Sequence, residues 1–134
     1  MAGIPGGENL HRLVFAVLEH GMRSVGTPDG LAPALVEETG TGARTIKSYS
    51  GGALDTLVQA ARKGATASTA ERVAICWDGM LAGKDGDERA VMVVAQERGQ
   101  QRSLVFAQRY TLDGATVVPE GRPGLVAERA SMLG

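Results

Sequence analysis

The chain has 134 residues, of which 43% are hydrophobic and 22% are charged, and its formal net charge is -1 at pH 7. These values are typical of a folded globular domain of common size, so we expect residues 1–134 to form a single domain. The balanced charge argues against nucleic-acid binding, and the lack of a long apolar run or a signal peptide predicts a cytoplasmic protein without a membrane partner.

The first predicted element is an amphipathic helix that starts near Asn9 and ends near Gly21. Apolar residues recur in it at intervals of three and four, which places them on one helix face. Asn9 is a common N-cap residue, and Gly21 is of a type that commonly follows a helix end. The apolar residues of this face are Leu10, Leu13, Val14, Val17 and Leu18.

Residues 28–50 are predicted to form a β-hairpin. Two prolines and a glycine between residues 28 and 33 break any long helix. The glycine-rich run over residues 39–42 separates two short stretches that have strand character. A short helix over residues 33–38 is the alternative, because proline is tolerated in the first turn of a helix.

A second helix is predicted between Gly52 and Gly64, because apolar residues again recur at helical spacing between flanking helix breakers. From Arg72 onward the period of the pattern changes to that of strands. Short turns rich in glycine and aspartate separate these strands, so they are expected to pair as an antiparallel meander. The strands are predicted over Val73–Leu81, Arg89–Glu97 and Ser103–Leu112, followed by a short one over Ala115–Val118.

The predicted fold is α+β: an antiparallel sheet of about five strands, built from the hairpin and the three-strand meander, with two main helices packed on it. This element order is similar to the profilin-like arrangement of roadblock-type modules. The resemblance rests on element order and implies a fold that serves scaffolding, sensing and ligand-binding roles alike. Residues 1–7 and 123–134 are expected to be mobile ends, the latter either loose or folded into one helical turn.

The middle strand of the meander is apolar on both faces. If residues 99–100 form a two-residue turn, Val94 faces Val105 and Met92 faces Ala107. A sheet with one solvated face would alternate instead, so both faces need a cover. The pattern favours a homodimer, in which a partner subunit covers the second face, although the tail or a ligand would also serve. The alternative is that the first helix and residues 28–38 lie on opposite sides and cover one face each.

Asp78 is the one candidate for a catalytic residue. Pairing Lys84 with Asp87 across the next turn places Asp78 beside Val93, among apolar side chains. Burial there would raise the pKa of the carboxyl group, as in general acids and bases that are tuned near neutrality. In the structural alternative, Asp78 and Gly79 begin a bulge or turn near the strand end.

The remaining chemistry-bearing residues form no recognisable site. His11 and His20 lie nine positions apart on the first helix and point to nearly opposite sides, so they cannot share a metal there. Cys76 is the single cysteine and is expected to act as a small hydrophobe within a strand. The glycines at residues 40–42 and 51–52 lack the sequence of a phosphate-binding loop. We therefore expect no metal and no cofactor, and the sequence leans against an enzyme.

Gln108, Arg109 and Tyr110 interrupt an otherwise apolar strand, and arginine and tyrosine are favoured at interfaces. With Trp77 they are the residues predicted to lie at a binding surface; the alternative is an ordinary solvated strand end. The predicted function is a small non-enzymatic interaction or regulatory module that binds itself, another protein, or both. The alternative is a small-molecule-binding protein or cofactor-free enzyme, with a pocket between the sheet and the helices and Asp78 as its polar group.

Overall fold

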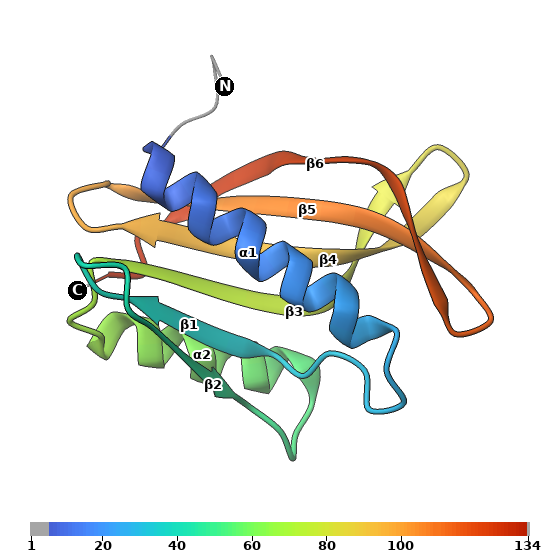
Figure 1. Ribbon diagram of the computed structural model, residues 1–134, viewed down its shortest axis with the longest axis horizontal. Coiled ribbons are helices and arrows are strands. Elements are labelled where there is room, and N and C mark those ends of the chain that lie inside the picture. The colour runs from blue at the N-terminus through green and yellow to red at the C-terminus, as the bar shows by residue number, and fades with distance from the viewer. Residues whose placement is uncertain (1–5, 134) are drawn as a thin grey trace.

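Two helices and six strands make up the part of the chain that the computed structural model describes, residues 6–133. They are, in chain order, α1 (Glu8–Val25), β1 (Ala34–Glu38), β2 (Arg44–Ser48), α2 (Leu54–Ala67), β3 (Arg72–Gly83), β4 (Gly86–Glu97), β5 (Arg102–Asp113) and β6 (Thr116–Ala130). The strands form one antiparallel sheet in the order β2-β1-β3-β4-β5-β6, with the two helices on opposite faces (Figure 1). The predicted α+β class is confirmed. The sheet has six strands rather than about five, and the profilin-like order is only roughly matched, because the meander contains four strands.

The first helix is present but both of its predicted ends are wrong. α1 begins after Gly7 rather than Asn9, and it continues through Gly21 to Val25. A Cβ atom at position 21 would lie 2.5 Å from Cγ1 of Val91. Gly21 therefore permits the close approach of α1 to the sheet and does not end the helix.

The second helix also runs past its predicted end. α2 continues through Gly64 to Ala67, and a Cβ atom at position 64 would lie 2.8 Å from the hydroxyl of Tyr49. As in α1, the glycine serves close packing rather than termination. Within residues 6–133 neither helix has the length and apolar character needed to cross a membrane.

The predicted hairpin is confirmed, and the alternative of a helix over residues 33–38 is wrong. β1 and β2 are joined by a tight turn, in which the backbone N–H of Thr39 donates to the carbonyl of Ala43 at 2.9 Å. Gly42 has a φ of +91°, a conformation that glycine adopts at little cost. The glycine-rich run is thus a turn.

The last strand is much longer than the sequence indicates. β6 spans residues 116–130, in place of the short strand over residues 115–118 and the loose or helical tail from residue 123. Pro119 and Pro123 weaken its strand pattern in the sequence. They are tolerated because, in the part of the chain that the structure describes, β6 pairs only with β5 and its outer side has no ladder of hydrogen bonds to satisfy.

The predicted register of β4 against β5 is confirmed, since Val94 faces Val105 and Met92 faces Ala107. The central part of β4 is buried on both faces, and the chain itself supplies the cover. α1 packs on one face, while α2 and Met132 of the tail pack on the other. α2 covers this face over β1 and β3, and Met132 of the tail adds to the cover, so residues 28–38 are not what covers it. The apolar character of this face gives no support for a homodimer.

The turn between β3 and β4 is tighter than predicted. Lys84 does not pair with Asp87, and the register shifts by two residues, so that Asp78 faces Val91 instead of Val93. Because side chains alternate between the faces of a strand, a shift by two residues leaves the predicted faces unchanged.

Candidate functional site

The outer side of β2 is an open end of the sheet. All five residues of this strand are exposed, and among residues 6–133 its only neighbour in the sheet is β1 (Figure 1). A sheet edge presents N–H and C=O groups without partners in the sheet, which is a template for pairing with another strand. We call the outer side of residues 44–48 the β2 edge.

The hydrogen bonds of the hairpin determine which backbone groups point outward. The N–H of Tyr49 donates to the carbonyl of Pro33 at 2.8 Å, which makes these two residues a hydrogen-bonded pair. Hydrogen-bonded and non-hydrogen-bonded pairs alternate along two antiparallel strands. It follows that Arg44, Ile46 and Ser48 direct their backbone N–H and C=O groups away from β1.

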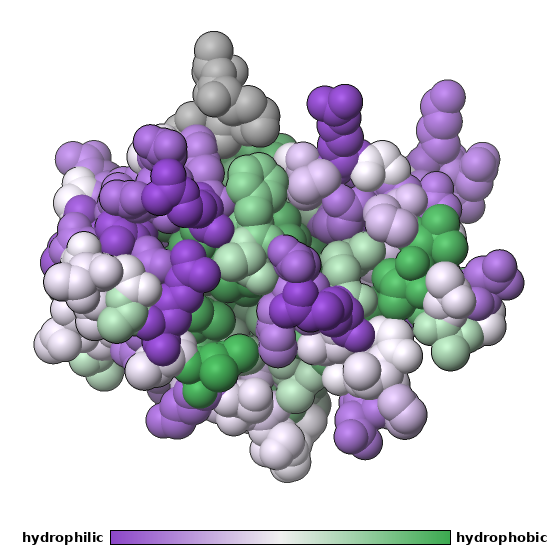
Figure 2. All heavy atoms as spheres, viewed as in Figure 1, coloured by the Kyte–Doolittle hydropathy of each residue, from purple (hydrophilic) through white to green (hydrophobic). Residues whose placement is uncertain are grey.

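Ile46 lies at the centre of the β2 edge, and 54% of its surface is exposed. It faces Val36, a residue of the core beneath α1, so its side chain lies on the α1 face of the sheet. A shallow groove of about 200 Å³ separates it from the helix, and Figure 2 shows hydrophobic surface in this region. We call it the α1–β2 groove; it is lined by Leu13, Ala16, Val17, His20, Val36, Arg44, Thr45 and Ile46.

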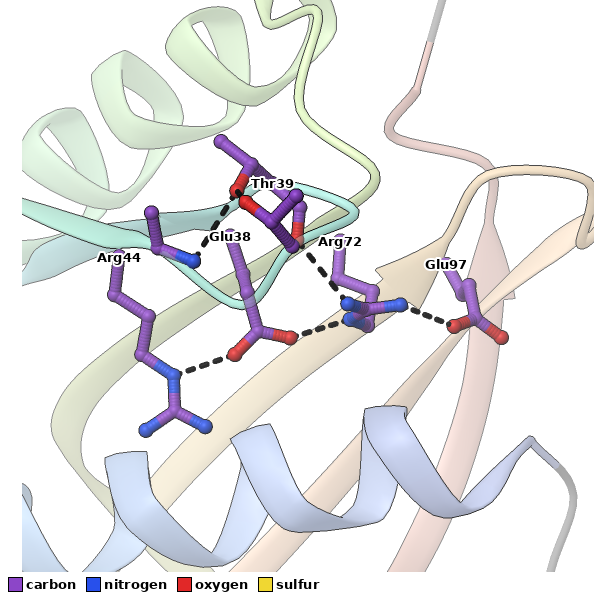
Figure 3. A network of polar contacts seen from close by, with 7 residues as sticks. Glu38, Thr39, Arg44, Arg72 and Glu97 are labelled. Carbon is purple, nitrogen blue, oxygen red and sulfur yellow. Dashed lines mark hydrogen bonds and ion pairs between the residues drawn. The ribbon is translucent and has the colours of Figure 1, made fainter.

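A network of ion pairs holds the turn end of the hairpin (Figure 3). Glu38 accepts hydrogen bonds from Nε of Arg44 and from Nε of Arg72. Arg72 also donates to Oε2 of Glu97 at 2.9 Å and to the carbonyl of Thr39 at 3.2 Å. The network thereby joins β1, β2, β3 and β4 at one end of the sheet.

The members of this network are held in their charged forms. Burial by itself would raise the pKa of Glu38, but the hydrogen bonds from Arg44 and Arg72 outweigh it and lower that pKa. The hydrogen bond to Glu38 likewise raises the pKa of Arg72. Since Glu38 and Arg72 are both buried, removing either one would leave the other with a single ionic partner, Glu97 for Arg72 or Arg44 for Glu38, which is unfavourable.

Asp78 is tied to two residues that the structure brings next to it. It accepts a hydrogen bond from the hydroxyl of Tyr110 at 2.6 Å and one from Arg89 at 2.9 Å. The guanidinium of Arg89 also lies 5.0 Å from the ring centre of Tyr110. Asp78 therefore has polar partners, and it lies opposite the apolar Val91 rather than beside Val93 as predicted. Burial and the hydrogen bond to Asp78 raise the pKa of Tyr110.

The four residues predicted at a binding surface do not lie together. Tyr110 and Gln108 are buried, and Gln108 donates to the backbone carbonyl of Gly121 at 3.1 Å. Trp77 is partly buried in the cluster beneath α2, on the face opposite to Tyr110. Arg109 is partly exposed and pairs with Glu88 at 3.2 Å. A binding role for these residues stays a prediction, and only Arg109 has an exposed ionic group.

A cleft opens where the two hairpin tips separate. The pairing of β4 with β5 ends at Ala90 and Arg109, and beyond these residues the tip of β3 and β4 diverges from the tip of β5 and β6 (Figure 1). We call this space of about 610 Å³ the fork cleft. It is lined by Asp87, Glu88, Arg89, Tyr110, Thr111, Leu112 and Glu120.

The residues most often used for nucleophilic or metal chemistry are dispersed. Cys76 is fully buried, and burial raises its pKa to about 11, which disfavours the reactive thiolate. The ring of His11 packs against Phe106, whereas His20 lines the α1–β2 groove. Within residues 6–133 no three histidine, cysteine, aspartate or glutamate side chains are grouped as metal ligands would be.

Sequence reasoning did not single out Ile46, Glu38 or Arg72. The alternation of residues 44–48 predicts a strand with one apolar residue among polar ones, but it gives no sign that this strand ends the sheet. The ion pair between Glu38 and Arg72 joins residues 34 positions apart, and no local pattern reveals it.

The fold and the site define the class of this protein: an α+β protein whose six-stranded antiparallel sheet is covered on both faces and open at the β2 edge. No protein-family model, curated protein or solved structure matches the chain. What the protein does must therefore follow from its own geometry.

Proposed function

We propose that this protein is a non-enzymatic interaction module that binds an extended segment of a polypeptide chain along its β2 edge. The observation that carries the proposal is an edge strand exposed at each of its five residues, with the half-exposed Ile46 at its centre. An added strand would obtain main-chain hydrogen bonds from Arg44, Ile46 and Ser48. Strand addition of this kind is a recurring mode of peptide recognition.

The two edges of the sheet differ in a way that favours β2. β6 carries Pro119 and Pro123 and has two register irregularities, features that blunt an edge against further pairing. β2 contains no proline, and its five residues pair with β1 in continuous register. The edge that can accept a strand is therefore that of β2.

The β2 edge is also held in place before any partner arrives. The network around Glu38 and Arg72 ties the hairpin to β3 and β4, so little conformational freedom is lost when a strand binds. On the α1 face, the groove beside Ile46 offers an apolar position for a side chain of the added strand. Backbone pairing would supply affinity, and this groove would supply selectivity.

The test is a proline substitution at an outward-facing position. Ile46→Pro removes one outward N–H and places a ring against the added strand, while the hydrogen bonds to β1 come from the neighbouring residues. Peptides selected on the wild-type protein from a random-sequence display library are expected to bind Ile46→Pro roughly tenfold or more weakly.

The matched control is Val126→Pro, at the irregular position between two register-paired stretches of β6. It is expected to bind the selected peptides as the wild type does, and circular dichroism checks that both variants fold. If every selected peptide binds Ile46→Pro as tightly as the wild type, the β2 edge is not the binding site and the proposal fails.

Binding of a small molecule in the fork cleft is the second candidate function. The cleft volume of about 610 Å³ falls in the range of about 300–1,000 Å³ that is usual for ligand pockets. Arg89 and Tyr110, the two partners of Asp78, lie in its wall. In a fragment screen followed by NMR, fragments that bind in the cleft should shift the amide signals of Thr111 and Leu112. If every fragment binds elsewhere on the surface, this candidate function fails.

A further inference from the structure

We infer that the strand added at the β2 edge is β2 of a second copy of this chain, antiparallel and related by a two-fold axis at Ile46. The inference rests on the proposed function and names its partner. Such an axis is perpendicular to the sheet, so the two six-stranded sheets would join into one continuous sheet. Both α1 helices would lie on one face of it and both α2 helices on the other.

The backbone geometry of β2 suits this pairing. With Ile46 opposite Ile46 of the second copy, Arg44 lies opposite Ser48 of the second copy at either end. These are the three residues whose N–H and C=O groups point outward, so each outward group meets a partner. Sliding one strand by two residues in either direction leaves only two pairs in which outward-facing residues lie opposite each other.

The charges are compatible with this register and disfavour one of its alternatives. In the arrangement centred on Ile46, Lys47 faces the neutral Thr45 of the second copy, and Arg44 faces the neutral Ser48. Moving the centre to position 47 would place two lysines directly opposite each other, which is unfavourable. Arg44 is further neutralised within its own chain by Glu38. The register centred on Ile46 thus places no two like charges directly opposite each other.

The apolar surface of the edge also fits a second copy. The two Ile46 side chains would meet on the α1 face, where each is now half exposed next to the α1–β2 groove. Their contact removes apolar surface from water on both copies. Five residues on each side make a small interface, so the dimer is expected to be reversible and to depend on concentration.

The first experiment measures the dimer dissociation constant by sedimentation equilibrium. Thr45→Lys places a lysine opposite Lys47 of the second copy on both sides of the axis, and the dimer is expected to weaken roughly two- to thirtyfold. Within the hairpin, residue 45 faces Glu37, so the same substitution does not introduce repulsion in the monomer. Adding Lys47→Glu to Thr45→Lys turns the repulsion into attraction and is expected to restore the dimer.

The second experiment uses cysteine cross-linking to locate the axis. Cys76 is fully buried, so Ile46→Cys adds a thiol whose reaction with a short bis-maleimide can be followed on its own. Ile46→Cys is expected to give a cross-linked dimer, whereas the control Val126→Cys on β6 still pairs through β2 but is expected to give no cross-linked product, because β6 lies at the opposite edge of the sheet.

The outcomes separate this inference from the proposed function. If the wild-type protein is monomeric at all concentrations but still binds peptides that Ile46→Pro does not bind, the inference of a dimer fails while the proposed strand addition stands. A dimer that survives Ile46→Pro and does not respond to the charge changes overturns the inference, because the copies then meet elsewhere. A dimer that Thr45→Lys weakens and the double variant restores supports it.

Discussion

The hydroxyl of Tyr110 donates a hydrogen bond of 2.6 Å to Oδ1 of Asp78, 32 positions earlier in the chain. Tyr110 belongs to β5 and Asp78 to β3, so this bond passes across β4. Arg89 of β4 donates to the other carboxylate oxygen at 2.9 Å. Three adjacent strands are thereby linked next to the point where β4 and β5 separate.

Tyr110→Phe should destabilise the protein, because it keeps the ring and removes the donor to Asp78. We expect the free energy of unfolding to fall by about 1.5–3 kcal/mol, the effect of losing a hydrogen bond to a charged group. Urea denaturation followed by circular dichroism measures this change. Tyr49→Phe is the matched control, and an equal loss there would contradict the role assigned to the Tyr110 hydroxyl.

The effect of Tyr110→Phe should also depend on pH. Burial and the hydrogen bond to Asp78 raise the pKa of Tyr110 in the folded state. A raised pKa gives stability that is fully present below the unfolded-state pKa of about 10 and is lost as the pH rises through the folded-state pKa. The difference in stability between wild type and variant is therefore expected to shrink above about pH 10.

Glu38→Gln should be among the most destabilising substitutions on the sheet. It leaves the buried Arg72 with Glu97 as its remaining carboxylate partner, and removing one partner of a buried ion pair costs about 3–5 kcal/mol. We expect a loss near the lower end of that range, because glutamine retains one acceptor. Thermal and urea denaturation measure it, and Glu8→Gln, which alters an exposed ion pair on α1, serves as a control with almost no effect.

Acid titration gives a second test of the contribution of Glu38 to stability. Its folded-state pKa is lowered, so its contribution to stability is present above the unfolded-state pKa of 4.5 and is lost as the pH falls through the folded-state pKa. The stability difference between wild type and Glu38→Gln is expected to be constant near neutrality and to shrink below about pH 4.5. A difference that grows in acid would mean that the network does not hold Glu38 ionised.

Gly21→Ala tests the close packing of α1 on the sheet. The added Cβ would lie 2.5 Å from Cγ1 of Val91, so the helix must move away from β4. Overpacking of this kind typically costs about 1–3 kcal/mol, partly offset by the higher helix propensity of alanine. Denaturation curves measure the net loss, and Gly40→Ala, where a Cβ would meet open space, is expected to be nearly neutral. A Gly21→Ala protein as stable as the wild type would contradict the tight contact.

Met132→Ala tests whether the tail is part of the cover of the second face. Met132 is 3% exposed, its N–H donates to Oε1 of Gln96 at 2.7 Å, and its carbonyl accepts from Thr66 at 2.7 Å. Truncating a buried methionine to alanine costs about 2–5 kcal/mol. Faster amide exchange in β4 and α2 and a lower unfolding midpoint are expected, whereas Val126→Ala, on an exposed side chain, should leave both unchanged.

The sequence by itself determined the local elements of this protein. The spacing of apolar residues predicts both helices, and the glycine-rich turns predict the hairpins. The turns also set the register of the strands, and therefore the face of the sheet on which each residue of β4 lies. These features depend on neighbours within a few positions, which a linear pattern contains. The pattern was misleading where a residue serves a distant contact, as at Gly21, or where an edge position tolerates proline, as at Pro119 and Pro123.

Only the tertiary structure decided how the elements are arranged. It placed β1 beside β3 and the two helices on opposite faces, and this cover removed the reason for expecting a partner on the second face. It also joined Asp78 to Tyr110 and Glu38 to Arg72, and it left β2 as an open edge. Periodicity shows that a residue lies on a face, but which element covers that face depends on contacts between distant segments, and these form only when the whole chain packs.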